Sequence, residues 1–506
     1  MIPRSLAFST AFAVLASSLL QPSASAGVEP ESGMATVLAS AALPMPSPIE
    51  APRTTPRKTA WQSRIESRMA AVPSVDGTSS DGETARGLAN ALQRITASMD
   101  DEAALGIAVK DLRTGRTVFE HHGQTALNPA SNHKLLTATA AVTLLGDDFR
   151  FETRVLREGD TLFLRGGGDP SLQVEDLEAL AAQVDAAGVS RIVIDDSMFS
   201  ARVFGPGYDP AGPGFSYMAP SGALSLQYNT VVVRVAADHS EDGVNVRLDP
   251  PCPHLQVERG RPHGPVNVTT FARGGKTIVR VDGRPQAPTR IRRRIANPGR
   301  FTASVFATAL GHDGLEIERG TTPKTATLIA RHESAPLPDV LGSALKFSNN
   351  FTTEQVLRTL GHLATGAPGD WDNGGAVLRE FWTATGADPD ALTFENASGL
   401  SRRGRVTPRA MVDLVSLWAR DERASAVLQA LPIAGREGTL RGRLRRSRGR
   451  VRAKTGTLSD ATGLTGVVTD SDGDPRYAFS VLVGTEHVGK AKRLQDRVVM
   501  ALVSGS

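Results

Sequence analysis

Residues 131–145 read Ser-Asn-His-Lys-Leu-Leu-Thr-Ala-Thr-Ala-Ala-Val-Thr-Leu-Leu, directly after a break in the chain at 128–130. Apolar side chains fall on almost every side of the helix that this stretch predicts, and such a helix is buried in a protein core. Gly146 supplies a stop at its end. Ser131 and Lys134 stand three residues apart in the first turn and therefore lie on one face. The stretch predicts a buried helix that begins with a hydroxyl beside an amine.

This pair has the geometry of a nucleophile and its base. A serine hydroxyl is a weak nucleophile unless an adjacent base takes its proton, and a helix N-terminus stabilises negative charge that develops there. Lysine acts as this base only when its pKa falls from about 10.4 towards about 7, through burial or a second cation. We therefore expect Lys134 to be buried, with another lysine in the same site.

Two further motifs follow in order along the chain. Ser348-Asn349-Asn350 has the form S-x-N, and Lys454-Thr455-Gly456 is the only K-[ST]-G. S-x-x-K, S-x-N and K-T-G in this order form the motif set of penicillin-interacting serine enzymes. A lone S-x-x-K has little weight, because a solvent-facing pair on any helix produces it, and Ser343–Lys346 is a second match. That match stands too close to Ser348 to form an opposing wall, so Ser131 is the predicted nucleophile.

The elements at the two ends of the folded region predict one antiparallel sheet. Residues 105–111 and 117–120 flank a turn and predict a hairpin. The end of the chain predicts two strands and a helix, at 463–469, 477–483 and 490–503.

The N-terminal residues predict export. Arg4 supplies a basic start, residues 6–20 supply an apolar run, and Ala24-Ser25-Ala26 has the form of a cleavage site, so 1–26 is the predicted signal peptide. The apolar run is shorter than the roughly 20 residues that span a membrane, and we expect no stable span after cleavage. Residues 27–82, rich in Ala, Pro, Ser and Thr, predict a low-complexity linker.

The remaining chain predicts one domain in two parts, 83–150 and 337–506. The second part has helical patterns at 337–363 and 407–430. Between the two parts, 151–336 has short alternating runs separated by Gly and Pro, which predict a β-rich insertion. The predicted fold is of the α/β class, an antiparallel sheet flanked by helices and split by this insertion.

Composition excludes several classes of protein. With 40% apolar residues, the chain of 506 residues can build cores, which excludes overall disorder. Its single cysteine, Cys252, excludes an internal disulfide framework and Cys-rich metal sites. His121 and His122 have no third ligand near them in the sequence, so we predict no metal and no cofactor. The net charge of +4 gives no argument for nucleic acid as a partner.

From about Ala104 to its C-terminus, the chain resembles the low-molecular-mass (class C) penicillin-binding proteins of the penicillin-binding protein 4 type, which are D-alanyl-D-alanine carboxypeptidases and endopeptidases. The long separation of Ser131 from Ser348 matches their large insertion, which class A β-lactamases lack. The resemblance implies a transpeptidase-like (serine β-lactamase-like) domain split around two nested modules, the inner one at about 230–290. It is carried by 129–137, 164–172, 217–225, 398–402, 431–435, 438–440 and 453–458.

The resemblance also implies a role for each residue of the first two motifs. Ser131 would attack the carbonyl between two terminal D-alanines to form an acyl-enzyme, and Lys134 would take its proton. Ser348, on the facing wall, would relay a proton to the leaving amine. Asn350 would bind the substrate backbone and hold Lys134 in place.

The third motif is implied to bind substrate through Lys454, Thr455, Gly456 and Thr457. Lys454 would lower the Lys134 pKa by like charge and, with the two threonines, hold the substrate carboxylate. The backbone N–H groups of Ser131 and Thr457 would form an oxyanion hole, worth roughly 3 to 4 kcal/mol per donor in serine hydrolases.

The predicted function is a periplasmic, serine-type D-alanyl-D-alanine carboxypeptidase that is also an endopeptidase. Its expected partners are peptidoglycan stem peptides and cross-links, with β-lactam antibiotics as inhibitors that acylate Ser131. Two alternatives stay open. One is a β-lactamase, against which the insertion argues, and the other is a non-hydrolysing penicillin sensor or wall-binding module, which has no need of Ser348.

Two arginine clusters, at 436–452 and 290–294, have two interpretations. Either they attract anionic cell-wall strands or a stem-peptide carboxylate, or they are solvated segments of an arginine-rich protein.

Overall fold

The computed structural model describes residues 59–72, 82–98, 104–238 and 243–506. The predicted signal peptide at 1–26 and most of the predicted linker at 27–82 lie outside these residues. Among the helices of the described ranges, none has both the length and the apolar composition needed to cross a membrane.

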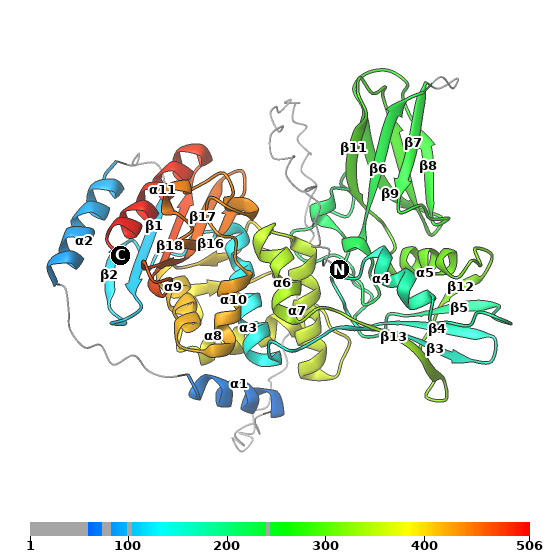
Figure 1. Ribbon diagram of the computed structural model, residues 1–506, viewed down its shortest axis with the longest axis horizontal. Helices are drawn as coiled ribbons and strands as arrows, with labels where there is room; N and C mark the ends of the chain where they lie inside the picture. The colour runs from blue at the N-terminus through cyan, green and yellow to red at the C-terminus, as the bar shows by residue number, and fades with distance from the viewer. Residues whose placement is uncertain (1–58, 73–81, 99–103, 239–242) are drawn as a thin grey trace, which may run out of the picture. The chain divides into compact units, whose positions relative to one another are not determined.

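A five-stranded antiparallel sheet joins segments from the two ends of the described chain (Figure 1). Its strand order is β16-β17-β18-β1-β2, and β1 pairs with β18 from Ala104 opposite Gly484 to Asp111 opposite Tyr477. The predicted hairpin, the two predicted C-terminal strands and their shared sheet are confirmed. The strands are β1 Ala104–Asp111, β2 Thr117–His121, β16 Val451–Thr457, β17 Ala461–Thr469 and β18 Pro475–Gly484.

Helices cover both faces of this sheet, because successive side chains of a strand point to opposite faces. In β18, Ala478 and Leu482 lie in one core with α3 and α6 to α10, whereas Phe479 and Val481 lie in another with α2 and α11. Figure 1 shows α2 beside β2 and α11 beside β17. The helices are α2 Gly82–Thr96, α3 Lys134–Leu145, α6 Leu337–Lys346, α7 Asn350–Thr365, α8 Trp371–Ala384, α9 Pro408–Ser416, α10 Glu422–Ala430 and α11 Val488–Ser504.

Both long helical patterns of the second part are divided by local capping. Asn349 begins α7 and accepts a hydrogen bond from the Thr352 N–H through its side chain. Asp421 caps α10 in the same way, after the 3-10 turn Leu417–Ala419. Such caps satisfy N–H groups that the first turn of a helix leaves without a partner. The first division leaves Ser348 in the short connection between α6 and α7.

The segment between the two parts forms three small sheets with its own core. Their strand orders are β12-β5-β4-β3-β13, β11-β6-β7 and β8-β10-β9. Two helices, which the strand patterns did not indicate, bury Leu177, Leu180, Phe301 and Phe306 in this core. The elements are β3 Glu152–Glu158, β4 Thr161–Gly166, α4 Val174–Ala181, β5 Arg191–Asp195, β6 Thr230–Ala237, β7 Val244–Asp249, β8 Leu255–Arg259, β9 Asn267–Arg273, β10 Lys276–Asp282, β11 Thr289–Arg294, α5 Pro298–Ala309, β12 Glu316–Arg319 and β13 Thr327–Glu333.

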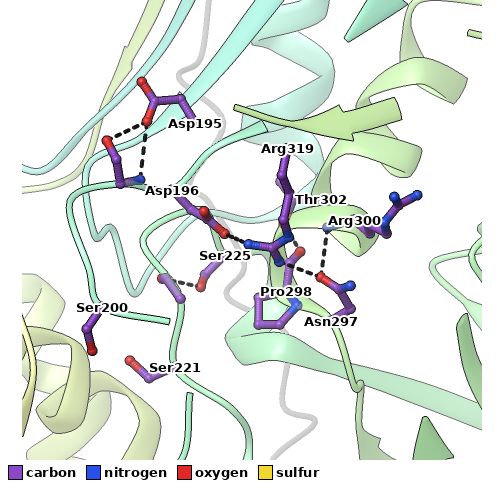
Figure 2. A network of polar contacts seen from close by, with 12 residues as sticks. Asp195, Asp196, Ser200, Ser221, Ser225, Asn297, Pro298, Arg300, Thr302 and Arg319 are labelled. Atoms are coloured by element: carbon purple, nitrogen blue, oxygen red, sulfur yellow. Dashed lines mark hydrogen bonds and ion pairs between the residues drawn. The ribbon is translucent and has the colours of Figure 1, made fainter. Parts of the chain in front are cut away.

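Polar contacts fix the corner where β5, α5 and β12 meet (Figure 2). The Asp195 carboxylate accepts hydrogen bonds from the backbone N–H and the hydroxyl of Ser197, at 3.2 and 2.6 Å. Arg319 pairs with Asp196 and also donates to Asn297 Oδ1 at 2.8 Å. Since Asn297 caps α5, these bonds tie the start of that helix to two strands of the sheet.

One helix lies within the segment that composition predicts to be a linker. Residues Ala60–Ala70 form α1, capped by Thr59. Trp61 and Ile65, one turn apart, are buried in the same core as α3 and α8. The Ala, Pro, Ser and Thr content of the whole segment hides this single short apolar face, so 27–82 is not a linker throughout.

Candidate active site

Ser131 and Lys134 are brought into contact at the start of α3. Ser131 lies on a 3-10 turn, Ala130–His133, and Lys134 is the first residue of the α-helix. The Lys134 Nζ donates to Ser131 Oγ at 3.0 Å. Lys134 is fully buried, as the sequence predicts, whereas the Ser131 side chain keeps partial access to solvent.

Two further oxygen atoms fix the Lys134 amine. Asn350 Oδ1 accepts from Nζ at 2.7 Å, and the Ser398 carbonyl oxygen accepts at 2.6 Å. The Asn350 amide donates its Nδ2 to the Tyr217 carbonyl at 3.0 Å, which fixes its own orientation. The amine therefore makes three hydrogen bonds in a fixed geometry beside the Ser131 hydroxyl.

The other two motifs meet across the same site. The Lys454 Nζ donates to Ser348 Oγ at 2.9 Å and to the Thr455 carbonyl at 2.6 Å. Ser348 has a φ of 61°, a left-handed conformation that is uncommon for any residue with a side chain. Such strain persists only where the surroundings enforce it, and it is concentrated at functional sites.

Burial lowers the pKa of both lysines. It lowers the pKa of Lys134 well below its usual value, and the charge of Lys454 lowers it further, while Glu354 opposes the change. Burial also lowers the pKa of Lys454 to about 7. The pKa of His133 falls to about 4, by burial and then by the Lys134 charge. His133 is buried, at 3% exposed. Lys134 thus has the environment that a lysine base requires.

The K-T-G strand reaches the Ser131 turn because Gly456 has no side chain. A Cβ at Gly456 would lie 2.5 Å from the Pro129 carbonyl oxygen and 3.0 Å from the Ser131 backbone nitrogen. Thr455 points its hydroxyl to Thr439 at 2.8 Å. Thr457, at the end of β16, is exposed. The edge strand of the sheet is thus held directly against the nucleophile turn.

The second S-x-x-K does not form such a pair. Ser343 and Lys346 lie on α6, where Ser343 Oγ donates to the Val340 carbonyl at 3.1 Å. The Lys346 amine instead pairs with Glu437 at 3.1 Å. This serine and lysine therefore have separate partners, and the sequence spacing alone does not create a base.

Glu354 is a buried residue of this site that the motifs do not indicate. It lies on α7, four residues after Asn350 and on the same helix face. Its carboxylate accepts from the Ser398 N–H at 2.9 Å and from Trp371 Nε1 at 2.7 Å. Because the Ser398 carbonyl is a partner of Lys134, Glu354 positions the loop that holds the amine. Only the i to i+4 spacing from Asn350 could have indicated it.

The same motifs supply no metal ligands. Within the described ranges, no group of three or more His, Cys, Asp or Glu side chains is arranged to hold a metal ion.

The sheet, its helices and the three motifs at its edge define a class, the penicillin-binding, β-lactamase-like serine enzymes. Within that class, the chain belongs to the D-Ala-D-Ala carboxypeptidase 3 (S13) family, whose model matches residues 88–503. It is therefore a peptidase. The D-alanyl-D-alanine carboxypeptidase of Actinomadura sp. (strain R39) is 31% identical over 79% of this chain and 81% of the relative.

The crystal structure of penicillin binding protein 4 from Haemophilus influenzae has the same fold. It has a TM-score of 0.71 and 23% identity, covering 82% of this chain and 99% of that one. A second structure of that protein, complexed with a novel β-lactam, has a TM-score of 0.66 and 22% identity, covering 81% and 98%.

Proposed function

We propose that this chain is a serine-type D-alanyl-D-alanine carboxypeptidase that acts on peptidoglycan stem peptides through an acyl-enzyme. The family supports the reaction, and the contact of Lys134 Nζ with Ser131 Oγ at 3.0 Å carries the proposal. A buried amine of lowered pKa beside a serine hydroxyl is the arrangement that nucleophilic catalysis by serine needs.

In the acylation step, Ser131 Oγ attacks the carbonyl carbon of the penultimate D-alanine while Lys134 Nζ takes the hydroxyl proton. The oxyanion is stabilised by the backbone N–H groups of Ser131 and Thr457, which act where the charge develops. The C–N bond then breaks, and the leaving amine receives a proton through Ser348. Free D-alanine leaves, and the rest of the peptide stays as an ester on Ser131.

Substrate binding in this proposal uses the K-T-G strand and the S-x-N motif. Lys454, with Thr455 and Thr457, holds the terminal carboxylate, and Gly456 lets the strand approach the ester. Asn350 donates to the substrate backbone. In the second step, water attacks the ester, Lys134 accepts a proton from it, and Ser131 regains its own.

The same acyl donor, a D-alanyl carbonyl, is present in peptide cross-links, so we extend the proposal to endopeptidase activity. β-Lactams acylate Ser131 because their ring amide occupies the position of the D-alanyl bond. The pattern at residues 1–26 supports secretion into the periplasm, where this substrate lies.

The test measures release of D-alanine from a synthetic peptide that ends in D-Ala-D-Ala. We expect Ser131→Ala to lose at least about 10³-fold in kcat, as removal of a nucleophile does in other serine hydrolases. Ser343→Ala is the matched control, since it removes the serine of the other S-x-x-K, and it is expected to retain activity and covalent penicillin labelling. Continued release or labelling in Ser131→Ala would refute the nucleophile assignment.

The other outcomes separate the alternatives. Labelling of Ser131 without any D-alanine release, from either the short peptide or a cross-linked dimer, would identify a penicillin sensor. Rapid turnover of penicillin without peptide cleavage would identify a β-lactamase.

A further inference from the structure

The arginine-rich segment 436–448 is fixed beside the proposed active site. Thr455 of the K-T-G strand donates its hydroxyl to Thr439 at 2.8 Å. On the other side, Glu437 pairs with Lys346 at 3.1 Å, two residues before Ser348. The segment therefore contacts both the strand that carries the third motif and the connection that carries the second.

Some arginines in and next to this segment stabilise the fold. Arg443 pairs with Asp496 of α11 at 2.8 Å. Arg450 donates to the carbonyl oxygens of Thr469 and Val503, at 2.9 and 3.2 Å. These two side chains have the partners expected of a folded, solvated segment.

The other arginines of the segment contact the described part of the fold less: Arg436 donates to the Arg448 carbonyl oxygen at 3.3 Å, within the segment itself. They are exposed, and among the residues that the structure describes no acidic side chain forms an ion pair with them. We call this group the arginine face, and it consists of Arg436, Arg441, Arg445, Arg446 and Arg448.

The backbone of the segment is held in place while these side chains point outward. Leu444 and Arg448 both have a positive φ, of 56° and 54°. The Leu444 side chain is buried in the same core as α11. A fixed backbone therefore presents these guanidinium groups from one short segment, and their attraction for anions falls as salt screens it.

The arginine cluster at 290–294 is of a different kind. Arg294 is 5% exposed and donates to the carbonyl oxygens of Asp209 and Pro210, at 2.8 and 2.6 Å. Arg293 lies over the Phe215 ring at 5.7 Å. These two members of that cluster serve the fold of the insertion. Six of the 13 residues of 436–448 are arginine, against 48 of 506 in the whole chain, so a uniform excess of arginine does not explain this cluster.

We propose that the arginine face is a docking surface for the carboxylates of the peptidoglycan strand whose stem peptide enters the active site. This inference rests on the proposed function for the identity of the polymer. The guanidinium group matches the geometry of a carboxylate and pairs with it bidentately. A polymer presents many carboxylates at once, so it reaches the arginine face and the active site together, whereas a short peptide occupies only the site.

The test measures co-sedimentation of the full chain with isolated peptidoglycan, in a Ser131→Ala background that prevents cleavage. The variant neutralises three members of the face, R441Q/R445Q/R446Q. The matched control removes the same charge from exposed arginines of the insertion, R247Q/R284Q/R290Q. Each exposed ion pair contributes little, but the triple variant R441Q/R445Q/R446Q loses three of them together. We therefore expect it to bind about tenfold more weakly at low salt. The control is expected to bind like its parent.

Chemical amidation of the peptidoglycan carboxylates tests the chemistry of the partner. We expect it to weaken binding of the parent as much as the triple substitution does, and to add little to that substitution. Sodium chloride is expected to weaken the parent and the control but hardly the triple variant. An equal loss of binding in the control would show that net charge alone governs binding, which would overturn the proposal. Unchanged binding in the triple variant, or equal binding of the parent to phosphatidylglycerol vesicles, would also overturn it.

The same substitutions with Ser131 intact separate this proposal from the proposed function. Penicillin labelling and D-alanine release from a short peptide are expected to stay within about twofold of the unsubstituted chain, since neither involves the arginine face. Absence of release in the unsubstituted chain would contradict the proposed reaction while leaving the binding comparison intact.

Discussion

Replacing Glu354 with glutamine removes one buried negative charge and keeps the shape of the side chain. The carboxylate accepts from the Ser398 N–H at 2.9 Å, the Trp371 Nε1–H at 2.7 Å and the Ala397 N–H at 3.3 Å. Glutamine keeps one of the two oxygens, so at least one donor then faces an amide N–H. A hydrogen bond to a charged group contributes about 1.5–3 kcal/mol, and we expect the folded state to lose about that much.

The same substitution changes the pH dependence of the reaction. Burial and Lys454 lower the pKa of Lys134, and Glu354 opposes them. Without this carboxylate the Lys134 pKa falls further, so the neutral amine persists to lower pH. His133, also beside Lys134, has a pKa of about 4 and stays neutral above it. The acid limb of kcat/KM, which reports the free enzyme, is therefore expected to move to lower pH.

The assay combines kcat/KM for D-alanine release across the acid limb with the thermal midpoint of the full chain. Glu178→Gln is the control, because Glu178 is exposed on α4 and far along the chain from the motifs. For a folded region of more than 400 residues the shift is about 1 °C per kcal/mol, so Glu354→Gln is expected to lower Tm by about 2–3 °C. A lower Tm with an unmoved acid limb would refute the claim that the Glu354 charge acts on the Lys134 pKa. An acid limb that moved to higher pH would show that the charge acts in the opposite direction.

Three further substitutions test the packing of the site. The Lys454 pKa of about 7 in place of 10.5 means that the folded chain binds fewer protons than the unfolded chain between these pH values. Burying an amine whose pKa falls this far destabilises the folded state by about 4 kcal/mol at pH 7, and Lys454→Met removes that destabilisation. The substitution also removes two hydrogen bonds, which together contribute about 2 kcal/mol. Calorimetry is therefore expected to show about 2 kcal/mol more stability, while D-alanine release is lost. Gly456→Ala is expected to slow penicillin acylation about 10²-fold by moving β16 from the nucleophile turn, whereas Gly442→Ala, where a Cβ meets open space, is expected to have no effect. Ile65→Ala is expected to cost about 2–4 kcal/mol of stability, and an effect no larger than that of exposed Ser67→Ala would mean that α1 does not stabilise the core.

Local pattern was sufficient for the elements that form the central sheet and its buried helix. Apolar runs on either side of a turn predicted β1, β2 and the two C-terminal strands, and β1, β17 and β18 each place side chains in both cores. Apolar side chains on almost every side of 134–145 predicted α3, because this helix is buried within the first core. The divided helices and α1 were missed, because single capping side chains and one short apolar face are weak signals in a window of average composition.

The roles of individual polar residues depended on contacts between distant segments. Lys134 and Lys346 both belong to an S-x-x-K. Only the fold gives Lys134 a serine partner and Lys346 a glutamate partner. Glu354 and the arginine face were beyond the motifs altogether. Their significance comes from Ser398, Thr455 and Lys346, which the fold brings beside them.

By itself, the sequence determined the order of the three motifs, the alternating strands and the buried helix, since these depend on side-chain type and on spacing within one segment. The tertiary structure alone decided which carboxylate was buried beside Lys134, which lysine of the two S-x-x-K motifs paired with a glutamate and which arginines stayed exposed. Burial and charge proximity set these properties, and both arise from residues that are hundreds of positions apart until the chain folds.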